Sequence, residues 1–427
     1  MSHPEHGIVR DFLDAVCLHV KAKELHPEIR DELSGHLAER TEELRAEGYA
    51  EMEAVAEAIR HMGSPQEIGG NLNRAHRPLP NWRMLIMLGL FVLVGLLAAV
   101  AVESANAAVI YEGLFFRKLV LTGVGLLVLA AVYFMDYRKL RKYSEFIFVG
   151  ALGLVGVTLT SGTTLNGQIP VLQLGGLILP TMELSLLLLL VAAAGQEHRR
   201  GWSGSLASFL YRGVLPLILL GLSGSMMLML MYLAGYLLLT WHADRSVKRL
   251  LYTGLSASVA AGFMLSRLDT FRMKLQVMLD ASASGHYGAQ MAEVIRSASW
   301  IGYGFASPGS SLPYIQSESV FPFLVYGFGW IAGVVIMLLV VLFLAEIVHM
   351  TFALKDGYAQ RVTLVVAAFF ALKMLWPVLM SFGLLPQVGI ELPFIAYGGV
   401  GQVFCYAAAG LLLSMYRRKN MLPGVVK

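Results

Sequence analysis

Charged residues are scarce in this chain of 427 residues: Asp, Glu, Lys and Arg make up only 15% of it, against 56% hydrophobic residues. A water-soluble domain of similar size carries about 25% charged residues. The surplus apolar residues are gathered in runs of about 17–25 residues, the length that spans the hydrocarbon of a bilayer. The composition therefore excludes an ordinary soluble protein and predicts an all-α, polytopic membrane protein.

Cysteines and targeting signals are scarce as well. The chain has two cysteines, Cys17 in its polar first part and Cys405 in an apolar run. We expect no disulfide, because the two lie in different compartments in the topology given below. We expect no cleavable signal peptide, since the first apolar run begins only near residue 84. The net charge of +4 is accounted for by basic residues on cytoplasmic loops, so no nucleic-acid partner is expected.

Residues 1–80 are polar and too short of apolar runs to span a membrane. Their apolar residues recur at helical spacing, in one stripe that starts at Val9 and another that starts at Ile29. Ser64, followed by proline and then by Glu67, is typical of a helix start. We therefore expect a cytosolic domain of three or four helices. The pattern resembles permease-prefix (HAAS-type) domains, and this resemblance implies a regulatory role and a cytosolic partner.

Residues 81–427 form the predicted membrane domain, with about ten apolar runs. The runs fall near residues 83–102, 118–135, 145–160, 177–194, 207–221, 224–241, 249–266, 320–348, 361–383 and 400–416. Basic residues cluster after every second run. By the positive-inside rule, these ends and both termini are expected in the cytoplasm.

Two segments on the opposite, external side attract attention. Residues 267–319 form a long loop that is rich in charged residues, in a chain that uses few elsewhere. Such loops are usually functional, although a merely tolerated solvated loop is the alternative. The second segment, Leu384–Gly401, is interrupted by prolines and glycines. It is either a stiff connector or one wall of a site.

Short motifs occur in a fixed order along the membrane domain. They are Asp136-Tyr137-Arg138, Asn166-Gly167, Glu183-Leu184, Leu279-Asp280, Gly302-Xaa-Gly304 and the LPFIAYGG of Leu392–Gly399. In a ten-span frame they resemble the SEDS family (shape, elongation, division and sporulation), which includes FtsW, RodA and SpoVE. The resemblance covers roughly residues 84–418. It implies the SEDS fold and a location in the bacterial cytoplasmic membrane.

The resemblance also implies a reaction. SEDS proteins polymerise lipid II, the undecaprenyl-pyrophosphate-linked disaccharide, and usually work with a class B penicillin-binding protein. A peptidoglycan glycosyltransferase acting in division, cell shape or sporulation is therefore implied. Its acceptor hydroxyl needs a general base, and its leaving pyrophosphate needs basic side chains or a divalent cation, Mg²⁺ or Mn²⁺.

Particular residues take roles from the resemblance. Counted back from Gly329, the family's base falls on Glu318; counted forward from Tyr314, Glu318 matches a different family glutamate, and both readings stay open. Without the family, Glu318 is equally a surface carboxylate near a helix start. The implied substrate-binding residues are Asn166, Arg272, Lys274, Gln290, Arg296, Pro393, Tyr397, Gly398 and Gly399. Asp280 and Glu293 are candidates for metal or structural support, and Asp136 and Glu183 hold structural family positions.

The chain also departs from the family pattern. The aspartate between the fifth and sixth runs is missing from Leu220–Gly224, the lysine near Glu183 is Leu186, and two acidic positions are Tyr326 and Gly327. A catalytically inactive scaffold or regulator is therefore one alternative function. A flippase for lipid-linked precursors is another, with Glu183 and Lys373 as the main intramembrane charges.

Overall fold

The structure is a computed structural model in which the chain divides into two compact units. One consists of Met1–Pro80 with Tyr416–Lys427, and the other of Asn81–Met415. The residues that the structure describes are 3–21, 23–75, 79–105, 112–165, 169–175, 177–195, 207–243, 254–255, 258, 262, 287–305 and 312–419.

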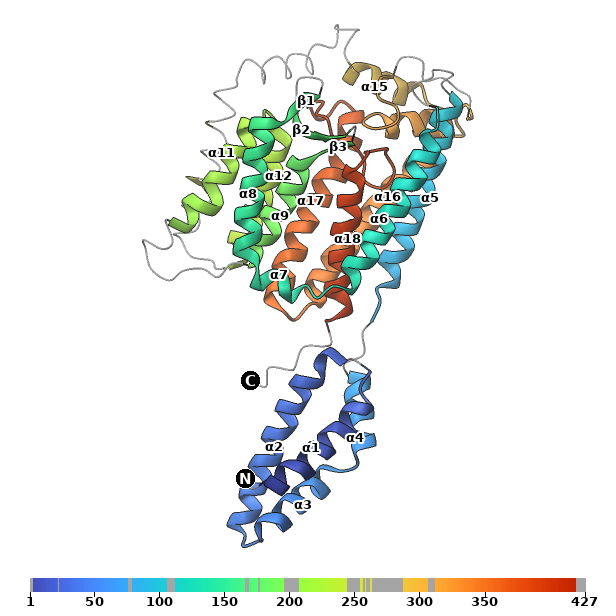
Figure 1. The fold of residues 1–427 in the computed structure, drawn as a ribbon. Coiled ribbons are helices and arrows are strands. Elements are labelled where there is room, and N and C mark those ends of the chain that lie inside the picture. The colour runs from blue at the N-terminus through green and yellow to red at the C-terminus, as the bar shows by residue number, and fades with distance from the viewer. Residues whose placement is uncertain are drawn as a thin grey trace. The chain divides into compact units, whose positions relative to one another are not determined.

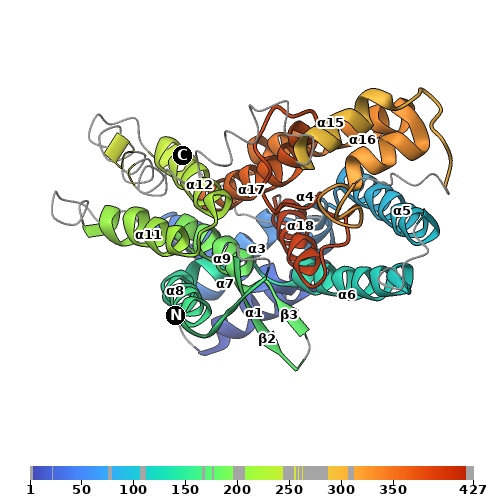
Figure 2. The same cartoon turned by 90° about the horizontal axis from the view of Figure 1, so that it is seen from above.

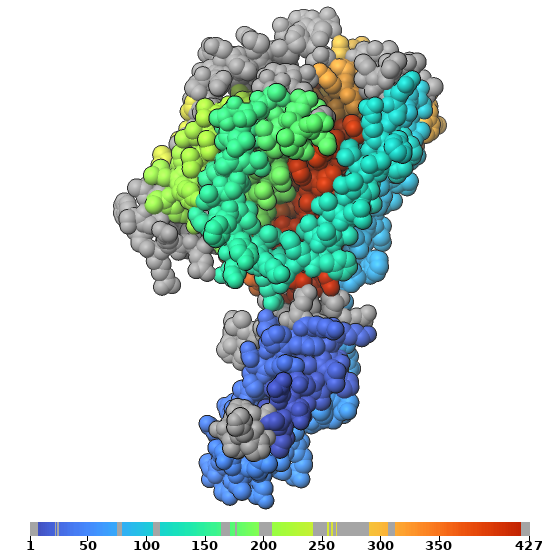
Figure 3. Space-filling view, viewed as in Figure 1, coloured from blue at the N-terminus to red at the C-terminus, as the bar shows by residue number. Residues whose placement is uncertain are grey.

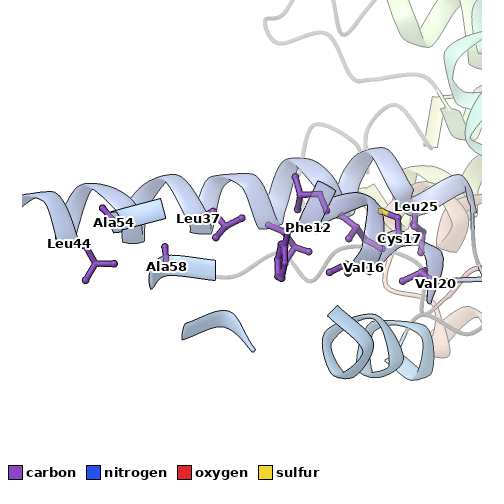
Figure 4. Packing of buried hydrophobic residues seen from close by; sticks show 12 residues of the cluster. Phe12, Val16, Cys17, Val20, Leu25, Leu37, Leu44, Ala54 and Ala58 are labelled. Atoms are coloured by element: carbon purple, nitrogen blue, oxygen red, sulfur yellow. The ribbon is translucent and has the colours of Figure 1, made fainter. Parts of the chain in front are cut away.

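The first unit is helical. Its elements are α1 (His3–Leu18), the 3₁₀ turn η1 (Lys23–Leu25), α2 (His26–Ala46), α3 (Glu51–Met62) and α4 (Pro65–Ala75). The apolar stripes of α1 and α2 pack together, as Figure 4 shows for Phe12, Val16 and Leu37. At the start of α4, the Glu67 backbone N–H donates to the Ser64 hydroxyl at 3.3 Å, which is the capping that the sequence predicts.

The second unit is a bundle of apolar helices (Figure 1). Its helices are α5 (Trp82–Ala105), α6 (Leu114–Phe134), α7 (Arg138–Lys142), α8 (Ser144–Ser161), α9 (Thr181–Gly195), α11 (Leu215–Leu222), α12 (Met226–Ala243), α15 (Tyr287–Ser297), α16 (Val320–Ala353), α17 (Gly357–Ser381) and α18 (Gly401–Arg417). Among the described residues, five helices, α5, α6, α8, α16 and α17, are long and apolar enough to cross a membrane. The chain is therefore an all-α, multi-pass membrane protein.

The predicted fourth span is wrong at its start. Leu177–Leu179 is a strand, β3, which pairs antiparallel with β2 (Ile169–Leu174), and β2 pairs with β1 (Thr163–Leu165). This small sheet lies over the ends of α8 and α9 (Figure 2). The segment is uncharged and apolar, so hydropathy alone extends the run, whereas α9 begins only after Pro180. The predicted seventh span, 249–266, lies mostly outside the described residues.

Helix α16 is broken at Gly329, whose backbone has φ 84° and ψ 172°. The break lets the segment before α16 pair with it through backbone atoms. The Gly304 N–H donates to the Gly327 carbonyl at 2.8 Å, and the Trp330 N–H donates to the Ser299 carbonyl at 3.0 Å. A Cβ atom on Gly302 would lie 2.3 Å from the Gly327 oxygen. The Gly302-Xaa-Gly304 motif is therefore explained by close backbone packing.

Helices α6 and α18 approach each other through small residues. A Cβ atom on Gly125 would lie 2.2 Å from the Tyr406 ring, and one on Gly410 would lie 2.7 Å from the Leu129 carbonyl oxygen. Figures 1 and 2 both show the two helices side by side. In Figure 3, the surface of α18 is visible between the surfaces of α6 and α8. Such contacts are typical of helices that pack in a lipid environment.

We expect Gly125→Ala to lower the stability of the protein by about 1–3 kcal/mol, because the added methyl group meets the Tyr406 ring. Gly123→Ala is the matched control two residues away on the same helix, where an added Cβ meets nothing within 4 Å. That substitution should leave the melting temperature in detergent unchanged or raise it. Equal melting temperatures for the two variants would contradict the packing.

Candidate functional site

The segment between α17 and α18, residues 384–400, is called the signature loop here, because it contains the LPFIAYGG motif. Its backbone adopts two left-handed conformations, at Phe394 (φ 66°) and at Gly399 (φ 53°). Phe394 is not a glycine, so its conformation costs free energy that the surroundings must offset. Its ring is buried, with ring centroids 5.8 Å from Phe370 and 5.1 Å from Tyr406. Aromatic packing therefore holds the strained residue in place.

The side chain of Lys118, in α6, forms hydrogen bonds with the backbone of the signature loop. Its side chain is only 1% exposed. The ammonium group donates to the carbonyl oxygens of Phe394 at 2.9 Å and Ala396 at 2.5 Å, and to the Gln402 side-chain oxygen at 3.0 Å. An ammonium group has three protons, and each has an acceptor here. The charge can therefore be buried in the bundle, and its hydrogen bonds hold the backbone of the loop in one conformation.

A second buried ammonium group lies on α17. Lys373 is fully buried and pairs with Glu183 at the start of α9, with 2.7 Å between Nζ and Oε2. Glu391, in the signature loop, lies beside this pair. A Cβ atom on Gly401 would lie 3.3 Å from an oxygen of Glu391 and 3.5 Å from an oxygen of Glu183. Two carboxylates and an ammonium group therefore meet around the glycine turn of the loop.

The glycine turn is shaped by Glu391. A Cβ atom on Gly398 would lie 2.0 Å from Oε1 of that carboxylate, so a larger residue would force the carboxylate to move. Gly399 is needed for a different reason, its positive φ. The two glycines of the motif are therefore explained separately, one by space and the other by backbone conformation.

The segment before α16 joins the signature loop on its other side. The Tyr397 N–H donates to the Gln316 carbonyl at 2.7 Å. Two residues on, the Glu318 side chain forms a hydrogen bond with the Gln387 side chain. Burial raises the pKa of Glu318 to about 7, the Gln387 hydrogen bond acts against this, and nearby Glu391 adds to it. A carboxyl group that titrates near neutral pH is suited to accept or donate a proton in a reaction.

The structure brings together part of the predicted site. Glu318 lies against the signature loop with Pro393, Tyr397, Gly398 and Gly399, and Glu183 lies beneath that loop. Gln290, Glu293 and Arg296 lie on α15, which packs against α16 and α17. Glu293 and Arg296 are exposed, whereas Oε1 of Gln290 is buried without a hydrogen bond among the described residues. The predictions for Asn166, Arg272, Lys274 and Asp280 fall outside the described residues.

Asp136 does not belong to this site. It lies at the turn between α6 and α7, where one of its carboxylate oxygens accepts from the Arg138 N–H at 3.0 Å. From Lys118 to Phe134, the end of α6, the chain rises roughly 24 Å at 1.5 Å per residue. Its neighbour Tyr137 is buried and stacks on Tyr358 near the start of α17, at 6.2 Å between ring centroids. The motif at 136–138 therefore shapes the opposite end of the bundle.

Only one of the two predicted metal candidates, Glu293, lies within the described residues, since Asp280 does not. Within them, no three His, Cys, Asp or Glu side chains gather as metal ligands. Glu293, the metal candidate that the structure describes, is exposed on α15. The carboxylates beneath the signature loop lie instead among ammonium groups, as the Glu183–Lys373 pair shows. We therefore derive no step through a metal.

Sequence reasoning missed Lys118, Gln387, Glu391 and Gln402. Lys118 carried a usable signal, since a lysine at the start of an apolar run is expensive to bury and is usually functional or paired. Glu391 stands directly before the LPFIAYGG motif and was equally visible. Nothing in the spacing of Gln387 or Gln402 reveals that their side chains meet Glu318 and Lys118.

The membrane part of the chain is similar to known cell cycle proteins. The family model of FtsW, RodA and SpoVE, described as "Cell cycle protein", matches residues 81–421. Stage V sporulation protein E of Bacillus subtilis is 23% identical over 361 residues, which cover 79% of this chain and 97% of the relative. A probable peptidoglycan glycosyltransferase FtsW of Shewanella sediminis is 26% identical over 326 residues, which cover 70% of this chain and 77% of the relative.

Solved structures share the fold. A chain from a peptidoglycan synthase complex matches with a TM-score of 0.66 at 22% identity, covering 80% of this chain and 98% of that one. The rod shape determining protein RodA of Thermus thermophilus matches with a TM-score of 0.59 at 20% identity, covering 80% of this chain and 97% of that one. The predicted fold class is thereby confirmed.

We expect Lys118→Met to destabilise the protein by about 3 kcal/mol, because buried acceptors lose hydrogen bonds from a charged donor. Arg117→Met is the control, since Arg117 is the exposed neighbour on the same helix. It should change stability by no more than about 0.5 kcal/mol. Thermal unfolding of both variants in detergent provides the comparison, and equal losses would refute the role of Lys118.

We expect Gly398→Ala to lower the melting temperature, because its methyl group overlaps the Glu391 carboxylate. The double variant Gly398→Ala/Glu391→Ala should recover part of the loss, since the obstructing group is gone. A double-mutant cycle measures this coupling, which we expect at about 1–3 kcal/mol. Strictly additive effects would show that the two residues do not meet.

Proposed function

The chain belongs to the FtsW/RodA/SpoVE family of cell cycle proteins, and we propose that it is a peptidoglycan glycosyltransferase that polymerises lipid II in bacterial cell-wall assembly. The observation that carries this proposal is Glu318, a carboxyl group with a pKa of about 7 beside the signature loop. The relatives named as probable peptidoglycan glycosyltransferases support the substrate class.

In the proposed reaction, the acceptor sugar hydroxyl gives its proton to Glu318. The oxygen of the acceptor hydroxyl forms a bond to the anomeric carbon of the donor sugar. The bond from that carbon to the pyrophosphate oxygen breaks, and undecaprenyl pyrophosphate leaves. The signature loop would position the sugars next to Glu318, since its backbone is fixed by Lys118 and by the Gln316 carbonyl.

The basic side chains proposed for the leaving pyrophosphate are Arg272, Lys274 and Arg296. Lys118 and Lys373 are not suited to that role. Lys118 donates to carbonyl and amide oxygens, and Lys373 donates to Glu183. Both ammonium groups therefore stabilise the fold around the site and are not available to a substrate. Mg²⁺ or Mn²⁺ remains a separate proposal for the leaving group, best tested by omitting the metal from the assay.

The proposal includes a topology and a partner. Both termini would be cytoplasmic, with Glu318 and the signature loop on the external face, because basic residues follow every second apolar run. A class B penicillin-binding protein would be the partner, which is supported by the likeness to a chain of a peptidoglycan synthase complex. Residues 1–80 would bind a cytosolic partner and regulate the membrane domain.

A second candidate function, a regulator or scaffold without turnover, is favoured by one observation. The two positions where the family has acidic residues, Tyr326 and Gly327, pair through their backbone carbonyls with Tyr303 and Gly304. No carboxylate is available at these positions, so Glu318 would work without them. Failure of the purified chain to polymerise lipid II, with and without a partner, would favour this second function.

We expect Glu318→Gln to lower kcat/KM for lipid II polymerisation by about 10²–10⁴-fold, as loss of a general base does. Glu318 is protonated below its pKa and can accept a proton only above it. The kcat/KM of the wild type should therefore rise about tenfold per pH unit up to about pH 7 and then level off. Glu318→Gln should lose this rise.

The control for that experiment is Glu112→Gln, which removes an exposed carboxylate just before α6. It should keep the activity and the pH profile of the wild type. An unchanged rate in Glu318→Gln would rule out Glu318 as the general base.

A further inference from the structure

The hairpin formed by β2 and β3 has an apolar tip that is exposed. At this tip Leu174 lies opposite Leu177, and Gln173 lies opposite Ile178. Leu174, Leu177 and Ile178 are 62%, 56% and 42% exposed. Large apolar residues that are exposed together mark a surface that contacts an apolar partner. Nothing in the proposed glycosyl transfer uses this tip.

The hairpin also lacks charge. No Asp, Glu, Lys, Arg or His occurs between Glu145 and Glu183. Strand β3 is the last strand of the sheet, so its outer edge has no strand partner among the described strands. Edge strands that face water usually carry charged residues, which keep them from pairing with other chains. Because β3 carries none, the hairpin is poorly suited to project into water.

The hairpin starts at the level of the membrane surface. Strand β1 begins two residues after α8 ends at Ser161, and α9 begins two residues after β3 ends at Leu179. Helix α8 is long and apolar enough to cross a membrane. Its end therefore lies where the hydrocarbon of a bilayer gives way to the headgroups. This is the signature-loop end of the bundle, since Glu183 lies in the first turn of α9.

The hairpin points sideways, away from the helices. Figure 2 shows it projecting from the bundle between α8 and α6. A strand of six residues, such as β2, reaches about 20 Å. Exposed apolar residues continue below it on both helices: Val157, one turn before the end of α8, is 51% exposed, and Val120, near the start of α6, is 47% exposed. The tip therefore lies over the lipid that surrounds these helices.

We propose that the tip of the β2–β3 hairpin inserts into the bilayer at the signature-loop end of the bundle, at the depth of the lipid carbonyl groups. The open edge of β3 sets this depth, because its backbone groups need water or lipid carbonyls and find neither in the hydrocarbon core. At that depth, the side chains of Leu174 and Leu177 contact acyl chains. The proposal does not depend on the proposed glycosyl transfer.

Fluorescence quenching in vesicles of phosphatidylethanolamine and phosphatidylglycerol tests the insertion. The full-length protein carries a nitrobenzoxadiazole fluorophore on Leu177→Cys. The native cysteines Cys17 and Cys405 are both buried, and the wild type measures their background labelling. We expect lipids with a nitroxide near the headgroup to quench the fluorophore more strongly than lipids with a nitroxide near the chain end. Aqueous iodide should not quench it.

Two reference positions calibrate the depth. Leu127 is 73% exposed in the middle of α6, so a label on Leu127→Cys should be quenched most by the deep nitroxide. Glu112 is exposed before α6, so a label on Glu112→Cys should be quenched by iodide. If iodide quenched the label at position 177 as strongly as the label at position 112, the insertion would be overturned. Because the protein is alone in these vesicles, that result would assign the tip to a protein partner instead.

Charged substitutions at the tip provide a second test, with the fluorophore on Ile178→Cys. Leu174→Asp with Leu177→Asp should abolish quenching by the lipid nitroxides and introduce quenching by iodide, because carboxylates favour water over acyl chains. The matched control, Leu174→Ile with Leu177→Ile, should be quenched like the parent protein. Both variants should keep the melting temperature in detergent, since both leucines are exposed. Equal lipid quenching in the two variants would overturn the proposal.

Discussion

The buried ammonium group of Lys118 is the interaction on which the candidate site depends. A charge in the apolar interior of a helix bundle must be matched by polar partners, or it is prohibitively expensive. Here the partners are two carbonyl oxygens of the signature loop and the side-chain oxygen of Gln402. The need to satisfy the charge therefore fixes the backbone at Phe394 and Ala396. The next residue, Tyr397, then meets the Gln316 carbonyl, which places Glu318 beside the loop.

The Glu183–Lys373 pair shows how a departure from a family motif can be compensated. Glu183 occupies its family position, but the lysine expected nearby on the same helix is Leu186, which is buried. In the structure, the ammonium partner comes from α17, across the bundle. The carboxylate is therefore paired although its motif is incomplete. Loss of a polar residue from a motif is weak evidence for loss of function when another helix supplies the same charge.

Sequence reasoning succeeded where the membrane itself imposes the pattern. Apolar runs predict α5, α6, α8, α16 and α17, because a spanning helix must satisfy its own backbone and present apolar side chains to lipid. It failed where tertiary contacts decide. Hydropathy did not distinguish the strand at Leu177–Leu179 or the break at Gly329 from a spanning helix, since both lie in apolar sequence.

The residues of the candidate site also fall into a group that the sequence predicted and a group that it did not. The LPFIAYGG motif and Glu318 were predicted from their resemblance to a family, and the structure places them side by side. Some of the contacts around them join residues far apart in the chain, such as Lys118 with Gln402, 284 residues apart, and Glu318 with Gln387. No local spacing encodes such contacts.

Two neighbouring carboxyl groups in one site acquire different roles when their surroundings differ. Burial raises the pKa of Glu391, and nearby Glu183 raises it further, although the ammonium groups of Lys373 and Lys118 act against this. At Glu318, burial is opposed by the hydrogen bond with Gln387, and the nearby charge of Glu391 raises the pKa further. Glu391 shapes the glycine turn, because its carboxyl group fills the space that a Cβ atom on Gly398 would take. Glu318 is the carboxyl group that changes its protonation near neutral pH, which is what a general base requires.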